Sequence, residues 1–384
     1  MELKEFQTHI RTLATLPETD APVISCYLDL EAGPLKYRNM LEERVRLLRK
    51  SLGEPARAQF DEALGRIMGF LESGIHPSAK GLALFARNGE VPFFMALSFH
   101  VPLPTWIAVS STPNIYHLVE LKDTYDRYVV MFATEASVRI LAVNLGSVTE
   151  QLWNERPELR ERVGREWTKE HYQRHRDERA NQFIQEEIRI LDQLMSARGY
   201  GHLILAGNPR MTARIEKALP KHLVKKLVDT VHASGSDRIP DVVAATLQSF
   251  VEQEERESVA MVDRLERSVR SNGLAVVGTA ATVSALEEGQ VDVLVLAKSY
   301  APDPGWMCCS CEAKGLNPVT PDRCPRCGDS AFLPLDAREE IVRIAEQGQC
   351  KVEIVTHSDV LMQLGGIGCL LRFLKPETYH SRAA

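Results

Sequence analysis

The chain has 384 residues, more than one ordinary domain holds, which predicts two or three domains. Its composition, 44% hydrophobic and 26% charged, is typical of a globular protein and excludes a disordered chain. The formal net charge of −6 argues against a surface that is basic all over and coats nucleic acid, but not against a local basic patch. We expect no signal peptide and no membrane span. Four of the eight cysteines form a metal-type cluster and the others are scattered, which fits a reducing cytoplasm better than a disulfide scaffold.

The first third of the chain alternates between strand and helix patterns. We predict strands at 23–30, 81–86 and 91–98 and helices near 37–51 and 55–72. Three prolines then break the pattern: Pro102, Pro104 and Pro113. These elements predict an N-terminal α/β domain over residues 1–121.

The rest of the chain also alternates, which predicts two further domains, each with a mixed or parallel sheet. The second, over 122–272, has a hairpin-like pair of strands at 128–133 and 137–143, a strand at 202–209 and a long amphipathic helix at 240–271. The third, over 273–384, has strands at 291–297 and 351–356 and a helix at 336–347.

A four-cysteine cluster interrupts the third domain. Cys308 and Cys311 form one Cys-x-x-Cys pair, and Cys324 and Cys327 form another after a twelve-residue spacer. Two such pairs supply the tetrahedral thiolate cage that zinc prefers, and four thiolates leave no open position, so we predict a structural Zn²⁺ site. Iron fits the same cage, and free cysteines or a redox pair are the alternatives. Cys309 is one residue too close to Cys311 to replace Cys308.

Two stretches on either side of this cluster carry a family resemblance. ATVSALEEGQVDVLVLA (281–297) and LGGIGCLLRF (364–373) resemble the C-terminal domain of the archaeo-eukaryotic class-one release factor and its relative Pelota. The strands at 128–133, 137–143 and 202–209 resemble that family's central domain more loosely. The resemblance is best to a bacterial subgroup that includes a ribosome hibernation factor. It implies three domains: an N-terminal domain on the decoding-centre side, a ribonuclease H-like central domain, and an L7Ae/L30e-like C-terminal domain with a zinc ribbon at 306–330.

The chain departs from this family at the motifs that carry termination. A release factor uses Gly-Gly-Gln to position water at the peptidyl-tRNA ester, and this chain has Gly-Gly only at 365–366, followed by isoleucine. The stop-codon motif Asn-Ile-Lys-Ser is also missing. We therefore expect no catalytic residues and no hydrolytic activity.

The family's Gly-Gly-Gln loop would fall at 167–183 in this chain. Basic and aromatic side chains gather there: His171, Tyr172, Gln173, Arg174, His175 and Arg176. They suit ribosomal RNA, because arginine pairs with phosphates and the rings of tyrosine and histidine stack on bases. The resemblance implies that this loop enters the peptidyl-transferase centre without doing chemistry. The alternative is a solvated helix, because residues 156–179 mix eight Lys/Arg with six Asp/Glu.

A second group of candidate residues is Gly365, Gly366 and Gly368. We expect their main role to be structural, in a tight turn before a strand, with docking of a partner as a secondary role. No phosphate-binding glycine loop and no nucleophile–base spacing appears elsewhere in the sequence.

The resemblance implies a non-hydrolytic factor that occupies the ribosomal A site during hibernation or stress. Its partners would be ribosomal RNA of both subunits and elongation factor Tu or another translational GTPase, and we expect a monomer that does not bind membranes. One alternative is a ribosome-rescue or release-type factor that cleaves peptidyl-tRNA with Gln173 or His175. Another is an RNA-binding scaffold unrelated to ribosomes.

Overall fold

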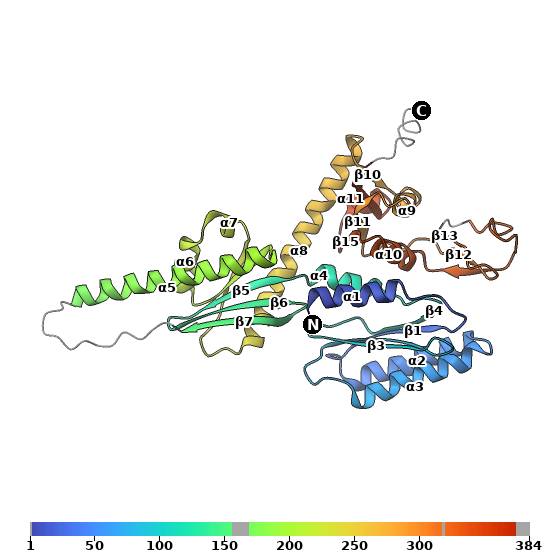
Figure 1. Ribbon diagram of the computed structural model, residues 1–384, viewed down its shortest axis with the longest axis horizontal. Coiled ribbons are helices and arrows are strands. Elements are labelled where there is room, and N and C mark those ends of the chain that lie inside the picture. The colour runs from blue at the N-terminus through green and yellow to red at the C-terminus, as the bar shows by residue number, and fades with distance from the viewer. Residues whose placement is uncertain (1, 156–168, 317–318, 374–384) are drawn as a thin grey trace. The chain divides into compact units, whose positions relative to one another are not determined.

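Figure 1 presents the computed structural model, which describes residues 2–155, 169–316 and 319–373. The chain divides into two compact units. Unit 1 holds residues 125–254 with the first three residues, and unit 2 holds residues 4–124 and 255–384. Within the described ranges, no helix has the length and apolar character needed to span a membrane.

The N-terminal part of unit 2 is an antiparallel sheet of order β3-β2-β1-β4. Apolar side chains of β1 and β2 pack with those of α2 and α3 in one buried cluster. The elements are α1 (Leu3–Ala14), β1 (Val23–Asp29), α2 (Pro34–Ser51), α3 (Ala56–Ser73), β2 (Gly81–Arg87), β3 (Phe93–Phe99), β4 (Trp106–Ser110) and α4 (Tyr116–Thr124).

The predicted strands and helices of this part are confirmed, but β4 was not predicted. We expected the prolines around β4 to interrupt the alternation of strands and helices. Instead, the strand lies between Pro104 and Pro113. It is the edge strand of its sheet, where flanking prolines remove no ladder hydrogen bond.

Unit 1 is a five-stranded sheet of order β7-β6-β5-β8-β9. β5, β6 and β7 are antiparallel, whereas β8 and β9 run parallel to β5. Apolar residues of α5 cover one face and those of α8 cover the other (Figure 1). The elements are β5 (Tyr128–Ala133), β6 (Ser137–Asn144), β7 (Ser147–Glu155), α5 (Lys169–Arg198), β8 (His202–Gly207), α6 (Pro209–Ala218), α7 (Lys221–Val224), β9 (Leu227–His232) and α8 (Ile239–Arg270).

The C-terminal part of unit 2 is a mixed sheet of order β10-β16-β11-β15, in which β11 and β15 are parallel. A separate three-stranded sheet of order β13-β12-β14 is inserted between β11 and α10. The elements are β10 (Ala275–Val277), α9 (Thr279–Glu287), β11 (Val291–Ala297), β12 (Gly305–Cys308), β13 (Lys314–Gly315), β14 (Phe332–Leu335), α10 (Ala337–Gln347), β15 (Lys351–Val355), α11 (Asp359–Gln363) and β16 (Ile367–Leu371).

Two carboxylates join the two parts of unit 2, and one of them, Glu339, is buried. Glu339 of α10 accepts hydrogen bonds from the backbone N–H groups of Ile115 and Tyr116, at 2.9 and 3.1 Å. Asp123 of α4 accepts from the backbone N–H of Ile354 in β15, at 2.6 Å. These contacts satisfy backbone donors at the start of a helix and at a strand, so the two sheets of unit 2 form one packed body.

Candidate functional site

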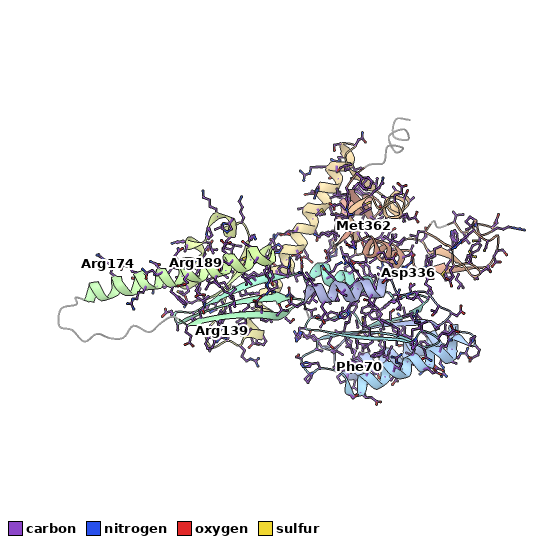
Figure 2. All side chains as sticks on the ribbon, in the orientation of Figure 1. Phe70, Arg139, Arg174, Arg189, Asp336 and Met362 are labelled. Atoms are coloured by element: carbon purple, nitrogen blue, oxygen red, sulfur yellow. The ribbon has the colours of Figure 1, made fainter. Side chains whose placement is uncertain are left out.

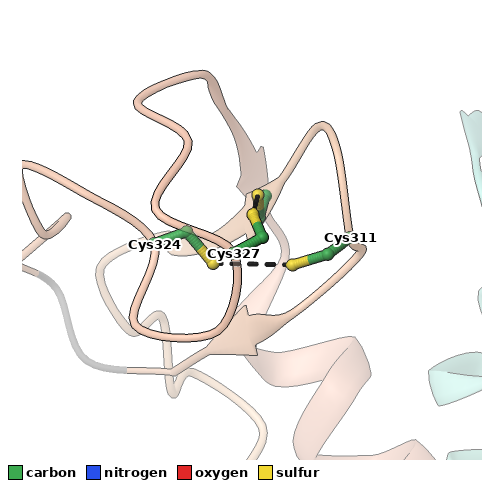
Figure 3. Close-up of side chains that lie close together, drawn as sticks. Cys311, Cys324 and Cys327 are labelled. Atoms are coloured by element: carbon green, nitrogen blue, oxygen red, sulfur yellow. Dashed lines mark hydrogen bonds between the residues drawn. The ribbon is translucent and has the colours of Figure 1, made fainter.

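The four predicted cysteines converge in the inserted sheet. The Sγ atoms of Cys308 and Cys327 lie 3.5 Å apart, as do those of Cys311 and Cys324. All four sulfur atoms lie within 4.8 Å of one another, and Figure 3 shows three of these side chains directed at one point. Cys308 and Cys324 are buried, and Cys327 is exposed.

The backbone around the two pairs repeats the same local geometry. The N–H of Glu312 donates to the carbonyl of Cys308 at 3.0 Å, and the N–H of Gly328 donates to that of Cys324 at 2.8 Å. Glu312 and Gly328 both have positive φ, 57° and 81°, directly after the second cysteine of each pair. Each Cys-x-x-Cys pair is therefore held in a tight turn that directs both thiols to the same side.

This donor set fits a tetrahedral metal ion. Zn–S bonds of about 2.3 Å place the sulfurs of a tetrahedron roughly 3.8 Å apart, close to the spacing found here. Burial raises the pKa of the Cys324 thiol, but hydrogen bonds from the backbone N–H groups of Cys327 and Arg326 outweigh it and bring that pKa to about 6. N–H groups directed at a sulfur favour the thiolate, the form that binds metal. Cys309 is exposed and is not part of the cluster.

Few apolar side chains pack around the cysteine cluster, but they fit together closely. The rings of Trp306 and Phe332 meet edge to face across β12 and β14, with centroids 5.3 Å apart. Gly315 leaves room for that indole, because a Cβ there would lie 2.3 Å from the Trp306 ring. So few apolar residues make a poor core, which is why a bound metal would matter to this sheet.

The basic group at 171–176 lies on a helix and not in a loop. We expected a loop over 167–179, but α5 begins at Lys169, so the backbone of all six residues belongs to its first turns. Arg174 is exposed (Figure 2). The other five side chains, and residues 156–168 that precede the helix, lie outside the described part. The mixed charge of the segment suits a solvated helix end, the alternative that the sequence left open.

The glycines of the third candidate group form the turn between α11 and β16. Gly365 and Gly366 have φ of 97° and 74°, in the left-handed region that disfavours other residues. A Cβ on Gly366 would lie 2.9 Å from the Tyr300 ring, and one on Gly368 would lie 2.9 Å from the carbonyl of Val276. This geometry gives the glycines a structural role.

Two features of the structure had no sequence signal. One is a set of carboxylates within unit 2, because Glu339, Asp123 and Glu353 acquire their partners only through tertiary packing. The other is an exposed tryptophan, Trp153, beneath which the guanidinium of Arg139 lies. Alternation along β7 would have indicated that Trp153 faces away from Leu152, but not that it is exposed.

Comparison with known proteins finds a family that part of the chain resembles. Residues 113–255 match the model of the bacterial archaeo-eukaryotic release factor family 10. Over this stretch the chain is similar to that bacterial family, and over most of its length it is similar to peptide chain release factors of Thermococcus.

Individual relatives are distant but extend over the whole chain. Peptide chain release factor subunit 1 of Thermococcus sibiricus is 22% identical over 409 residues, which cover 97% of this chain and 98% of the relative. Among solved structures, Pelota of Archaeoglobus fulgidus is 13% identical, with a TM-score of 0.37 and coverage of 97% of this chain and 93% of that one. An archaeal translation termination factor is 16% identical, with a TM-score of 0.27 and coverage of 97% and 99%.

Proposed function

We propose that this protein is a translation factor that occupies the ribosomal A site without hydrolysing peptidyl-tRNA, and so protects idle ribosomes during hibernation or stress. One observation carries the proposal. The chain aligns over 97% of its length with a peptide chain release factor, yet none of its 384 residues forms a Gly-Gly-Gln tripeptide. A factor that keeps the architecture but lacks the catalytic tripeptide is suited to binding and not to ester hydrolysis.

The Gly-Gly pair that the chain does contain is not available for chemistry. Gly365 and Gly366 have positive φ in the turn before β16, and the N–H of Gly366 donates to the carbonyl of Leu361 at 2.8 Å. In place of the release-factor loop the chain offers the segment that ends in α5, with Arg174 exposed. In our proposal, residues 171–176 contact ribosomal RNA near the peptidyl-transferase centre.

The domain roles follow the family. The order of three antiparallel strands followed by two parallel ones supports a ribonuclease H-like central domain. The C-terminal sheet would be an L7Ae/L30e-like domain that contacts the large subunit, and its inserted sheet would be a zinc ribbon, with Zn²⁺ held by Cys308, Cys311, Cys324 and Cys327. The division into domains at 1–121, 122–272 and 273–384 remains a prediction.

The N-terminal domain would lie on the decoding-centre side. Its helices α2 and α3 line an open groove of about 630 Å³ whose charged side chains are four basic ones and one acidic one: Arg46, Arg49, Lys50, Arg57 and Glu42. Arg49 also pairs with Asp61 of α3. Such a groove suits the RNA backbone, because phosphate contacts dominate the affinity of RNA-binding surfaces. The net charge of −6 works against binding by charge alone. Delivery by elongation factor Tu or another translational GTPase would ease this difficulty.

The test is cryo-electron microscopy of vacant ribosomes mixed with the protein, together with cosedimentation. We expect density in the A site, with residues 167–179 toward the peptidyl-transferase centre. Replacing residues 171–176 with alanines should weaken cosedimentation, whereas Arg189→Ala, an exposed arginine farther along α5 that pairs with Glu186, should not. Empty A sites, even with elongation factor Tu and GDP added, would refute the proposal.

The names of the relatives favour one alternative, a rescue or release-type factor with unorthodox catalytic residues. Release of labelled peptide from stalled ribosomes would reveal it, and loss of release in Gln173→Ala or His175→Ala would assign the chemistry. We rank this function second, because the glycines that give the release-factor loop its backbone freedom are missing from 167–179.

A further inference from the structure

An exposed tryptophan stands on the edge strand of unit 1. Trp153 lies in β7, which is the outermost strand beside β6, and its side chain is 54% exposed. The residue directly opposite it in the ladder is Arg139, so both side chains project from the same face of the sheet. The guanidinium carbon of Arg139 lies 5.1 Å from the centroid of the indole (Figure 2 labels Arg139).

The strand holds this tryptophan in a fixed direction. Asn154 donates to both carboxylate oxygens of Glu187 in α5, at 3.0 and 3.1 Å, and Glu187 is buried. Leu152 packs against the core cluster on the same side. Because successive side chains alternate across a strand, pinning residues 152 and 154 to the α5 face directs Trp153 to the opposite face.

That opposite face is only partly covered. Its apolar cluster includes Phe132 and Leu141 from the sheet with Val243 and Phe250 from α8, and Trp153 is not among its members. On β7 the neighbours two residues away from Trp153, Gln151 and Glu155, are exposed. Trp153 therefore lies beyond the area that α8 covers and presents a rigid aromatic surface to solvent.

Arg139 gives this surface a charge preference. Within the described ranges no carboxylate forms an ion pair with its guanidinium, so its charge is directed at the indole and the solvent beside it. A guanidinium stacked on a ring favours an incoming group that is both flat and attached to negative charge. An unpaired nucleobase with its phosphate has both properties, whereas a hydrophobic peptide segment would gain nothing from the arginine.

We propose that Trp153, supported by Arg139, is a stacking platform for an unpaired base of RNA. The identity of that RNA as ribosomal RNA rests on the proposed function, but the platform itself would act on any accessible single strand. It is separate from the basic residues at the start of α5, because it lies on the sheet face opposite to the one that α5 covers.

The experiment uses two fluorescein-labelled probes at low salt: a twelve-nucleotide oligoadenylate, and a ribose-phosphate chain of the same length without bases. We expect Trp153→Ala to weaken oligoadenylate binding about 5- to 150-fold, the loss typical of one stacked base, and to leave abasic binding unchanged. Trp153→Phe should retain most of the affinity. Val224→Ala, which removes an exposed apolar side chain from α7 of the same unit, is the matched control.

Circular dichroism and thermal melting of each variant establish that it is folded. Equal affinity of Trp153→Ala and the wild type for oligoadenylate, or no binding by the wild type, would overturn the platform. Cosedimentation separates this result from the proposed function: if the wild type binds oligoadenylate through Trp153 but not ribosomes, the platform stands and the proposed function fails. Loss of ribosome binding in Trp153→Ala without loss of oligoadenylate binding would assign the face to a protein and also overturn the platform.

Discussion

At the scale of single residues, the cysteine cluster shows how local backbone geometry brings four thiols together. Glu312 and Gly328 follow the second cysteine of each pair and both have positive φ. A glutamate pays a conformational penalty there that glycine does not. Glu312 therefore adopts a less favoured conformation in a turn that directs both thiols of its pair to the same side.

We predict that Cys324→Ser abolishes stoichiometric metal binding and loosens the inserted sheet. The thiolate supplies one of four ligands, and structural zinc sites hold small sheets that have little core of their own. Elemental analysis should give one Zn²⁺ per wild-type chain and none in the variant, with faster amide exchange over residues 305–335. Cys309→Ser is the matched control, because Cys309 is exposed and outside the cluster. Equal zinc content in wild type and Cys324→Ser would refute the site.

We predict that Gly366→Ala destabilises unit 2 by about 1–3 kcal/mol beyond the cost of positive φ itself. Gly366 has φ of 74°, and a Cβ there would lie 2.9 Å from the Tyr300 ring. Gly289→Ala separates the two effects, because Gly289 also has positive φ but a Cβ there would meet no atom within 4 Å. Urea unfolding of both variants measures the difference. Equal losses of unfolding free energy would show that backbone strain alone determines the role of Gly366.

At the scale of elements, α4 and α10 meet through a carboxylate at the start of a helix. Glu339 accepts from the N–H groups of Ile115 and Tyr116, which α4 leaves unpaired at its beginning. The guanidinium of Arg338 lies 4.1 Å from the centroid of the Tyr116 ring beside this contact. A carboxylate in the first turn of α10 therefore accepts the hydrogen bonds of the backbone N–H groups at the start of α4. This contact joins two sheets whose strands are far apart in the sequence.

This contact predicts that unit 2 loses stability as pH rises. Burial raises the pKa of Glu339 from 4.5 to about 7, despite hydrogen bonds from Tyr116 and Ile115. Burial and the charge of Glu353 also raise the pKa of Asp123. Since the folded state binds the proton more tightly than the unfolded state, the unfolding free energy should fall between about pH 4.5 and 7 and then level off.

Glu339→Gln should flatten this dependence, because the amide oxygen still accepts hydrogen bonds but does not titrate. Urea unfolding at intervals between pH 4.5 and 7.5 measures the slope. Glu287→Gln, at an exposed glutamate of α9 in the same unit, should leave the slope as in the wild type. If the unfolding free energy of Glu339→Gln depends on pH as strongly as that of the wild type, the effect belongs to Asp123.

The sequence predicted most elements and the convergence of the four cysteines, but not the contacts that depend on tertiary packing. Periodicity was sufficient for β1, β11 and α8, whose apolar patterns are long, and cysteine spacing was sufficient for the four-cysteine cluster. Periodicity was insufficient for β4, because the prolines beside this strand suggested a turn. The family resemblance placed residues 171–176 in a loop, whereas the mixed charge of the segment left a solvated helix as the alternative, and a helix is what the structure has there.

At the scale of the whole molecule, charge is the property that most constrains a ribosome-binding function. The chain carries 46 Lys and Arg against 52 Asp and Glu, so its overall field repels RNA. Binding then depends on places where basic side chains gather, such as the groove of α2 and α3 and the start of α5. A binder of this kind makes few phosphate contacts, and each one contributes a measurable part of the salt dependence.

We therefore predict that the ribosome affinity of this protein depends weakly on salt, and that Arg174 and Arg176 account for much of the dependence. Each phosphate contact contributes about −0.7 to −0.9 to the slope of log affinity against log salt, so Arg174→Gln with Arg176→Gln should make the slope less steep by roughly 1.5. Cosedimentation at a series of potassium chloride concentrations measures it. The matched control is Arg189→Gln with Arg198→Gln, two exposed arginines of α5 that pair with Glu186 and Glu150. An unchanged slope in the first variant would mean that the start of α5 does not touch RNA, and would leave the groove of α2 and α3 as the surface that does.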